Sequence, residues 1–154
     1  MPYDSEAELF DTALNSSFIK KLNSDQSSCM LFEPKGLFGV PDLLIANPKG
    51  KGTINSKMTV ISFEMKLRNW KRALSQAFKY RAFSNISYVV IDYDRANPAL
   101  RNLEIFERSN VGLLSINSEG LIQTHYEPTV DEPYCDDFRE KVNSIVLSKT
   151  QSNL

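Results

Sequence analysis

Near the start of the chain, hydrophobic side chains recur at helical spacing: Phe10, Ala13, Leu14 and Phe18. Residues three or four apart share one face of a helix, and Ser5 is a suitable N-cap residue. The pattern therefore predicts a helix from residue 5 to about residue 22. Glu6 lies one turn before Phe10, so the same spacing places it at the edge of the inward face.

Three later segments show the same helical periodicity: residues 70–83, 97–109 and 135–148. Asn69 is a plausible N-cap for the first of them. On that helix Arg72, Gln76 and Tyr80 are spaced four residues apart and line up on one stripe. Its aromatic residues Trp70 and Phe78 fit core or interface positions better than base-stacking positions.

Short apolar runs bounded by turn residues predict the strands: residues 29–34, 39–48, 58–67 and 87–92, and a hairpin over 111–126. The 58–67 run is rich in β-branched residues and alternates toward its end, as a strand does. The 87–92 run is continuously apolar, which is typical of a strand buried on both faces.

The predicted order is helix, three strands, helix, strand, helix, hairpin, helix. Tight connections join antiparallel neighbours, whereas the helix after residue 67 allows a parallel return to the 87–92 strand. We therefore expect an α/β fold with a central mixed β-sheet flanked by helices. One domain over residues 1–154 is expected, with a core from about 5 to about 126 and a C-terminal helix at about 135–148.

The remaining composition narrows the class of protein. Cys29 and Cys135 are far apart and outside any CxxC pair, which favours incidental thiols over a zinc cluster or a disulfide framework. His125 is the single histidine and fits a structural role. The acidic N-terminus does not resemble a signal peptide, and no apolar run is long enough to span a bilayer. We expect a soluble, cytoplasmic protein.

The net charge of −1 hides a strong segregation along the chain. Residues 43–91 carry nine lysines and arginines and one acid, Glu64, for a net charge of +8, whereas residues 1–42 and 92–154 are both acidic. Such a segment can attract a polyanion and still place an acid among its phosphates. A solvated basic helix face is the alternative interpretation.

Three residues have the chemistry for phosphodiester hydrolysis: Asp42, Glu64 and Lys66. Asp42 begins one predicted strand and Glu64 lies near the end of the next, so the connection between these strands can bring both carboxylates together. Glu64 and Lys66 are two residues apart on a strand and project to the same face. Met65 points the other way, which leaves its backbone carbonyl as a further ligand. Hard cations such as Mg²⁺ prefer these oxygen ligands.

These residues resemble the PD-(D/E)xK nuclease superfamily, which includes restriction endonucleases, Holliday-junction resolvases and RecB-type nucleases. Pro41-Asp42 resembles the PD element, and Glu64-Met65-Lys66 resembles the (D/E)xK element on the following strand. Gln76 and Tyr80 are similar to the QxxxY motif of the RecB-type branch. Glu6 matches the acid that many members contribute from their first helix. The basic connection over residues 47–58 is longer than a minimal hairpin and departs from the pattern.

The resemblance implies a restriction-endonuclease-like core and a site that binds Mg²⁺ or Mn²⁺. Asp42, Glu64 and the Met65 carbonyl would hold the metal, with Glu6 reaching it directly or through water. Lys66 would position the attacking water or stabilise the transition state, and Gln76 would support the metal shell. Candidate DNA contacts come mainly from the basic segment: Lys49, Lys51, Arg68, Arg72 and Tyr80.

The sequence therefore predicts a metal-dependent deoxyribonuclease, an endonuclease by preference, acting on double-stranded or branched DNA. A homodimer or a subunit of a larger nucleic-acid-processing complex is expected. Three alternatives stay open. The chain could be a non-catalytic binding or assembly module, Glu6 could be a first-turn acid favoured by the helix dipole, and the Gln76 and Tyr80 pair could be an ordinary helix-surface pair.

Overall fold

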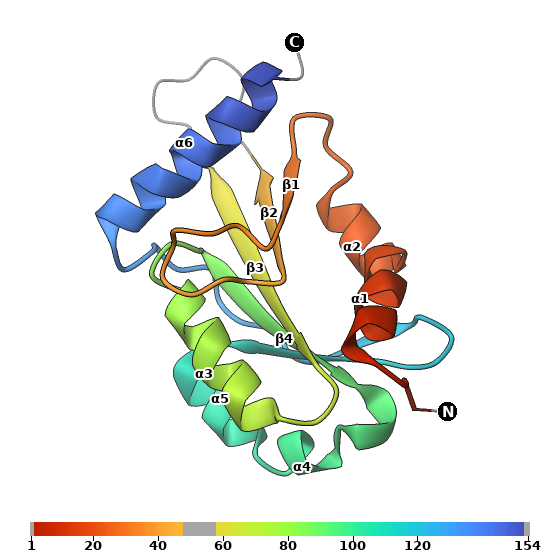
Figure 1. Cartoon of the computed structure of the whole chain (residues 1–154). Helices are drawn as coiled ribbons and strands as arrows, with labels where there is room; N and C mark the ends of the chain where they lie inside the picture. The colour runs from red at the N-terminus through yellow and green to blue at the C-terminus, as the bar shows by residue number, and fades with distance from the viewer. Residues whose placement is uncertain (1, 48–57, 153–154) are drawn as a thin grey trace.

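The computed structural model describes residues 2–47 and 58–152, and its centre is a six-stranded mixed sheet (Figure 1). The strands lie side by side in chain order: β1 (Cys29–Phe32), β2 (Leu43–Asn47), β3 (Thr59–Lys66), β4 (Ile86–Asp92), β5 (Gly112–Ile116) and β6 (Ile122–Tyr126). The helical elements are α1 (Glu6–Leu14), α2 (Ser17–Leu22), α3 (Trp70–Tyr80), the short 3-10 turn η1 (Tyr93–Arg95), α4 (Asn97–Leu100), α5 (Leu103–Ser109) and α6 (Asp136–Ser152).

The sheet changes direction where helices connect its strands. β1, β2 and β3 are antiparallel neighbours, β3, β4 and β5 are parallel, and β6 returns antiparallel to β5. The two parallel pairs are linked through α3 and through α4 with α5, since a parallel return needs a crossover. The α/β class and the predicted parallel pairing of β3 with β4 are both confirmed.

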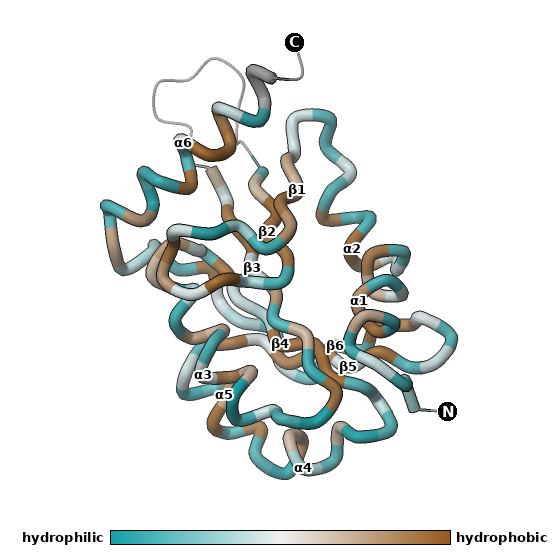
Figure 2. Tube along the Cα trace, viewed as in Figure 1, coloured by the Kyte–Doolittle hydropathy of each residue, from teal (hydrophilic) through white to brown (hydrophobic). Residues whose placement is uncertain are grey.

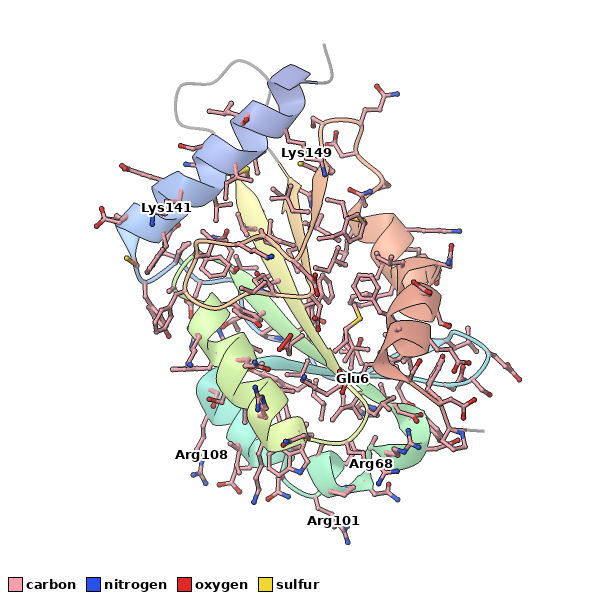
Figure 3. The ribbon with its side chains drawn as sticks, in the orientation of Figure 1. Glu6, Arg68, Arg101, Arg108, Lys141 and Lys149 are labelled. Carbon is pink, nitrogen blue, oxygen red and sulfur yellow. The ribbon has the colours of Figure 1, made fainter. Side chains whose placement is uncertain are left out.

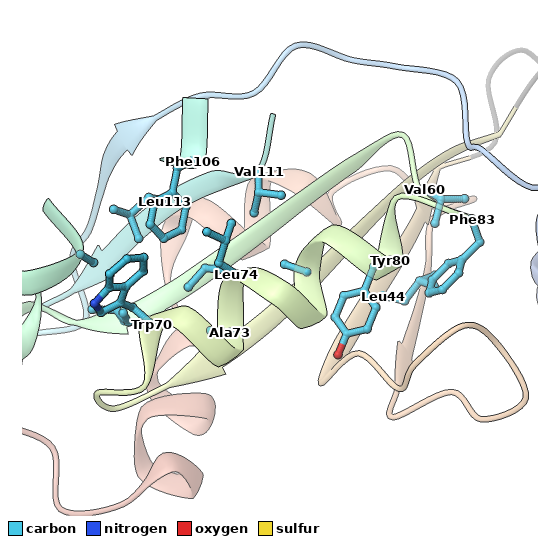
Figure 4. Packing of buried hydrophobic residues seen from close by; sticks show 14 of the residues in the cluster. Leu44, Val60, Trp70, Ala73, Leu74, Tyr80, Phe83, Phe106, Val111 and Leu113 are labelled. Atoms are coloured by element: carbon cyan, nitrogen blue, oxygen red, sulfur yellow. The ribbon is translucent and has the colours of Figure 1, made fainter. Parts of the chain in front are cut away.

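Helices cover both faces of the sheet, so the strands bury side chains on both sides. On β3, Ile61, Phe63 and Met65 pack with α1 and α2, whereas Val60 packs on the opposite face with α3. Figure 4 shows this second core, where Trp70 packs near Phe106 and Tyr80 lies near Leu44. Figure 2 shows hydrophobic residues along the central strands and hydrophilic residues on the outer surfaces of the helices. The two layers fix the ends of β2 and β3, where the predicted site lies.

Two predicted helices are each broken in the structure. The helix predicted over residues 5–22 divides into α1 and α2, because the Ser16 hydroxyl donates to the Ala13 carbonyl (2.6 Å) and caps α2 by accepting from the Ile19 N–H (3.3 Å). The helix predicted over 97–109 divides at Asn102 into α4 and α5. The uniform helical period does not reveal these breaks, because the apolar residues on both sides still face one core.

The two aromatic residues singled out on α3 differ in burial. Trp70 is buried in the core, as predicted, whereas Phe78 is 45% exposed and is not a core residue. Cys29 and Cys135 are free, half-buried thiols, and the His125 Nε2 hydrogen-bonds the Ser115 hydroxyl (2.7 Å). Within residues 2–47 and 58–152, none of the helices has the length and apolar character needed to cross a bilayer.

Candidate active site

Asp42 is fixed at the point where β2 begins to pair with β3. Its backbone N–H donates to the Phe63 carbonyl (3.0 Å), and its Oδ2 accepts from the Met65 N–H (2.8 Å). This geometry follows from the antiparallel register, in which Leu43 pairs with Phe63, so the residue before Leu43 meets the residue after Phe63. The predicted approach of Asp42 to Glu64 is therefore present in the fold.

Glu64 is a buried carboxyl, only 3% exposed, on the α3 face of β3. The Tyr80 hydroxyl lies 3.2 Å from its Oε2 and 2.9 Å from the Val40 carbonyl oxygen, so the phenol is shared between the two acceptors. The pKa of Glu64 is raised to about 8, first by burial and then by a hydrogen bond and the charge of Asp42, while Lys66 and Tyr80 act in the opposite direction. Two carboxyl groups in contact cannot both ionise easily, so the pair retains a proton near neutral pH.

A carboxyl pair that keeps a proton is not fully compensated by nearby positive charge, and a bound cation is one way to supply it. Magnesium is commonly held by one or two carboxylates together with several waters. Asp42 and Glu64 fit that description, and the Met65 carbonyl is a third candidate oxygen beside them. Among the described residues, no three acidic, cysteine or histidine side chains are grouped closely enough to hold a metal. The arrangement therefore fits a metal held by two carboxylates.

Gln76, on the helix that carries Tyr80, has a polar atom that no described residue satisfies. Its side-chain Oε1 is buried and has no hydrogen-bond partner within the described part of the chain. It lies on α3 one turn before Tyr80, which contacts Glu64 directly. A buried acceptor without a donor costs free energy, so an unmatched carbonyl here is consistent with a missing water or ligand.

Lys66 and Glu6 form an ion pair near Asp42. The Lys66 Nζ lies 3.6 Å from the Glu6 Oε2, and the Glu6 side chain is about half exposed. Figure 3 shows Glu6 at the start of α1, beside the end of β3. The structure therefore brings Glu6 to the site as the partner of Lys66 and does not group it with Asp42 and Glu64 in a three-carboxylate cluster.

A cavity of about 430 Å³ opens beside Asp42 on the α1 face. Its walls come from α1, the end of β1 and the residue after it, the residue before β2, and β3: Glu6, Ala7, Phe10, Asp11, Phe32, Glu33, Asp42 and Met65. Glu64 is absent from these walls because it faces α3. Asp42 therefore stands between an open cavity on one side and the buried Glu64 and Tyr80 pair on the other.

Glu33 is a site residue that the sequence reasoning missed. It directly follows β1, its φ of 45° lies in the left-handed region, and its N–H donates to the Asp42 carbonyl (3.3 Å). A left-handed φ is unusual for a residue with a long side chain. The β1 and β2 register could have revealed Glu33, since the residue after β1 must lie opposite the residue before β2.

The exposed surface of α3 and the turn before it is strongly basic. Arg68, Lys71, Arg72 and Lys79 are exposed, and α3 contains no acidic residue. Within the described residues none of these four forms an ion pair, although Lys71 lies over the Trp70 ring at 5.7 Å. From Arg72 through Gln76 to Tyr80, the predicted stripe runs from the surface into the site. Lys49 and Lys51 lie outside the described residues.

No protein-family model, curated protein or solved structure matches this chain.

Proposed function

We propose that this protein is a Mg²⁺-dependent nuclease of the PD-(D/E)xK type that hydrolyses DNA phosphodiester bonds. The observation that carries the proposal is the contact between the Asp42 and Glu64 carboxyl groups beside Lys66, at the edge of the basic surface of α3. Two contacting acids are costly to bury, and the backbone hydrogen bonds between β2 and β3 already hold this end of the sheet together. A purely structural role therefore does not need them.

Asp42 and Glu64 would hold the cation, with the Met65 carbonyl as a further oxygen. A metal bound there would offset charge on the phosphate and lower the pKa of a coordinated water. The Met65 N–H fixes one Asp42 oxygen, and Tyr80 orients one Glu64 oxygen, so each carboxyl keeps its other oxygen for a ligand. These fixed positions would reduce the reorganisation needed during the reaction.

Lys66 would orient the attacking water and stabilise the charge that develops on the phosphate. Glu6 pairs with the Lys66 ammonium and would hold it at the mouth of the site. The Gln76 carbonyl oxygen, which has no partner among the described residues, could accept from a water next to the cation. In this scheme Glu6 acts through Lys66.

The basic surface of α3 would bind the DNA backbone. Arg68, Arg72 and Lys79 are exposed and form no ion pair within the described residues, so their charges are available to phosphates. Backbone contacts of this kind supply affinity without sequence preference, and the affinity should fall steeply with salt.

Cleavage assays on supercoiled, linear and branched DNA with Mg²⁺ test the proposal. We expect wild-type protein to cut at least one of these substrates, and Asp42→Ala and Lys66→Ala to abolish cutting while leaving DNA binding in Ca²⁺ intact. Glu140→Gln and Lys20→Ala remove exposed charges on α6 and α2 and serve as matched controls that should cut normally.

Cutting that persists in EDTA, or that survives both site substitutions, would contradict a metal-dependent reaction at these residues. DNA binding without cleavage of any substrate would instead support a non-catalytic binding module built on the same fold.

A further inference from the structure

Three aromatic side chains are exposed together beside α3, although they come from distant parts of the chain. Phe38 lies between β1 and β2 and is 47% exposed, Phe78 is on α3, and Tyr134 precedes α6 and is 61% exposed. Phe38 stacks on the half-buried Phe138 at 6.0 Å, and Phe78 lies 6.4 Å from Tyr134. We call Phe38, Phe78, Tyr134 and Phe138 the aromatic patch. Figure 1 shows the β1–β2 connection running between α3 and α6, which is where these segments meet.

Each ring of the aromatic patch has a cation over one face. Lys79 lies 5.8 Å from the Phe38 ring and Lys141 lies 5.3 Å from Phe138. Lys141 is on α6, as Figure 3 shows. The Arg81 guanidinium lies 5.6 Å from Phe78 and 4.7 Å from Tyr134. Cations over ring faces stabilise exposed aromatic side chains.

Arg81 gives the Phe78 and Tyr134 pair a fixed support. It is buried, and its guanidinium donates to the Ser109 carbonyl (2.8 Å) and to Asp131 (2.9 Å). The Tyr134 N–H also donates to the Arg81 carbonyl (3.1 Å). Both rings therefore rest on a rigid cation and present their remaining surface to solvent. A flat ring surface that is already ordered loses little entropy when a planar ligand stacks on it.

Positive charge near the aromatic patch comes from its two lysines and from α3. Asp131 offsets the charge of Arg81, whereas Lys79 and Lys141 form no ion pair within the described residues. Three exposed acids on α6 reduce the local charge: Asp136, Asp137 and Glu140. On the α3 side the surface is continuous with the basic residues already described, and no acid interrupts the helix. Phosphates would therefore be guided along α3 and not along α6.

The aromatic patch is connected to the proposed active site by direct contacts. Phe38 is followed by Gly39, where φ is +85° and an added Cβ would lie 2.9 Å from the Tyr80 ring. Val40 accepts from the Tyr80 hydroxyl, which also contacts Glu64. Lys79, over the Phe38 ring, is the neighbour of Tyr80 in α3. One helix and one short connection thus carry both the ring surfaces and the buried carboxyl.

We propose that the aromatic patch binds unpaired nucleotides, so that the substrate is single-stranded DNA or DNA with a single-stranded segment. Base faces are covered by their neighbours in a duplex and become available for stacking on side chains in single strands. Lys79 and the basic surface of α3 would hold the phosphates while the bases stack on Phe78 and Tyr134. This inference deepens the proposed nuclease function. It rests on that function only in expecting the bound DNA strand to lead toward Asp42 and Glu64.

Fluorescence anisotropy with full-length protein, without Mg²⁺, tests the inference independently of cleavage. The probes are a labelled oligodeoxythymidine strand and a blunt duplex of equal length. We expect Phe78→Ala and Tyr134→Ala each to weaken single-strand binding by about tenfold and duplex binding by less than about twofold. Leu121→Ala is the matched control, because Leu121 has the same 61% exposure as Tyr134 but lies in the β5–β6 turn. It should change neither affinity.

A second measurement covers the case in which an alanine variant fails to fold. Phe78→Trp keeps a ring at this position, and its added fluorescence should be quenched by the single strand and little affected by the duplex. Equal losses for both probes, unchanged affinities, no quenching, or no single-strand binding by the wild type would each overturn the inference. A wild-type dimer that Tyr134→Ala converts to a monomer would assign the aromatic patch to a protein interface instead. Absence of cleavage with intact single-strand binding would contradict the proposed nuclease function and leave this inference standing.

Discussion

Two buried acids lie at or near the ends of the neighbouring parallel strands β3 and β4, and their hydrogen-bond partners differ sharply. Asp92, at the end of β4, is as buried as Glu64 and has a full set of donors. It accepts from the Tyr3 N–H (3.0 Å), the Asp94 N–H (3.1 Å) and the Arg95 guanidinium (3.0 Å). Glu64, near the end of β3, has one side-chain donor, Tyr80, and a second carboxyl, Asp42, in contact with it.

The contrast separates a buried carboxyl that the protein satisfies with its own donors from one that it does not. A buried carboxylate with a cation and two N–H donors is satisfied by the protein itself. Asp92 therefore anchors the N-terminal segment and η1 to the sheet. Glu64 has no such set of donors among the described residues, so its ionised form is costly to bury, and the proposed cation would offset that cost.

The largest effect is expected from Glu64→Gln. The substitution keeps the size of the side chain and removes its negative charge. Mutating a group that only supports a metal ligand typically lowers activity about 10- to 100-fold. Because Glu64 would be a ligand itself, we expect cleavage to fall about a thousandfold. Without metal the variant should be at least as stable as wild type, because a buried acid beside Asp42 has been removed. Cleavage assays and thermal melting in EDTA measure the two effects. Glu127→Gln is the matched control, since Glu127 also accepts from a tyrosine, Tyr88 (2.6 Å).

Asp92→Ala should show the reverse pattern. Removing the acid leaves the Arg95 charge and the buried Tyr3 N–H unpaired, which should lower the free energy of unfolding by about 3 kcal/mol. Cleavage by the folded fraction at low temperature should stay near the wild-type rate. Urea unfolding measures the first effect, with the exposed Glu107→Ala on α5 as the control. Loss of cleavage in a stable Asp92→Ala protein would mean that both acids belong to the active site.

The pKa of Glu64 predicts a pH dependence of stability in the metal-free protein. Its folded-state pKa of about 8 lies above the ordinary 4.5, so the folded state holds a proton that the unfolded chain releases. This contribution is complete below pH 4.5 and is lost as pH rises to about 8, with a slope of up to about 1.4 kcal/mol per pH unit.

Urea unfolding in EDTA across that range measures the slope. Glu64→Gln should be nearly independent of pH over the same interval, and Mg²⁺ should stabilise the wild type most at the alkaline end, where the site is ionised. Wild type and Glu64→Gln with identical slopes would show that Glu64 titrates normally.

The sequence predicted the parts of this site that depend on local pattern. Alternation along 58–67 and the antiparallel approach of 39–48 placed Asp42 beside Glu64, and the fold shows that contact. The helical stripe placed Gln76 and Tyr80 on one side of α3, and Tyr80 reaches Glu64. The metal and the reaction stay predictions. These successes share a cause, because hairpin register and helical period are properties of short segments.

The parts that escaped prediction depend on long-range geometry or on backbone detail. Glu33 joins the site only through the pairing of β1 with β2 and a left-handed φ. A core position predicted for Phe78 is wrong, since the ring is 45% exposed and is supported by Arg81 and by Tyr134, more than fifty positions away; an interface position stays a prediction. The pairing of Glu6 with Lys66 also required tertiary structure.

The smallest expected effect sharpens the comparison at a single hydroxyl group. Tyr80→Phe removes the donor shared by Glu64 and the Val40 carbonyl and keeps the ring that packs in the core. We expect cleavage to fall by about tenfold or less, because the carboxyl loses an orienting bond and retains its position in β3. Tyr126→Phe is the matched control. Tyr126 lies on β6, away from the site, and its hydroxyl donates a comparable hydrogen bond to the Asn110 side chain (3.1 Å). Equal cleavage by the two variants would mean that Tyr80 supports the fold alone, whereas a loss as large as that of Glu64→Gln would place its hydroxyl on the substrate or the cation.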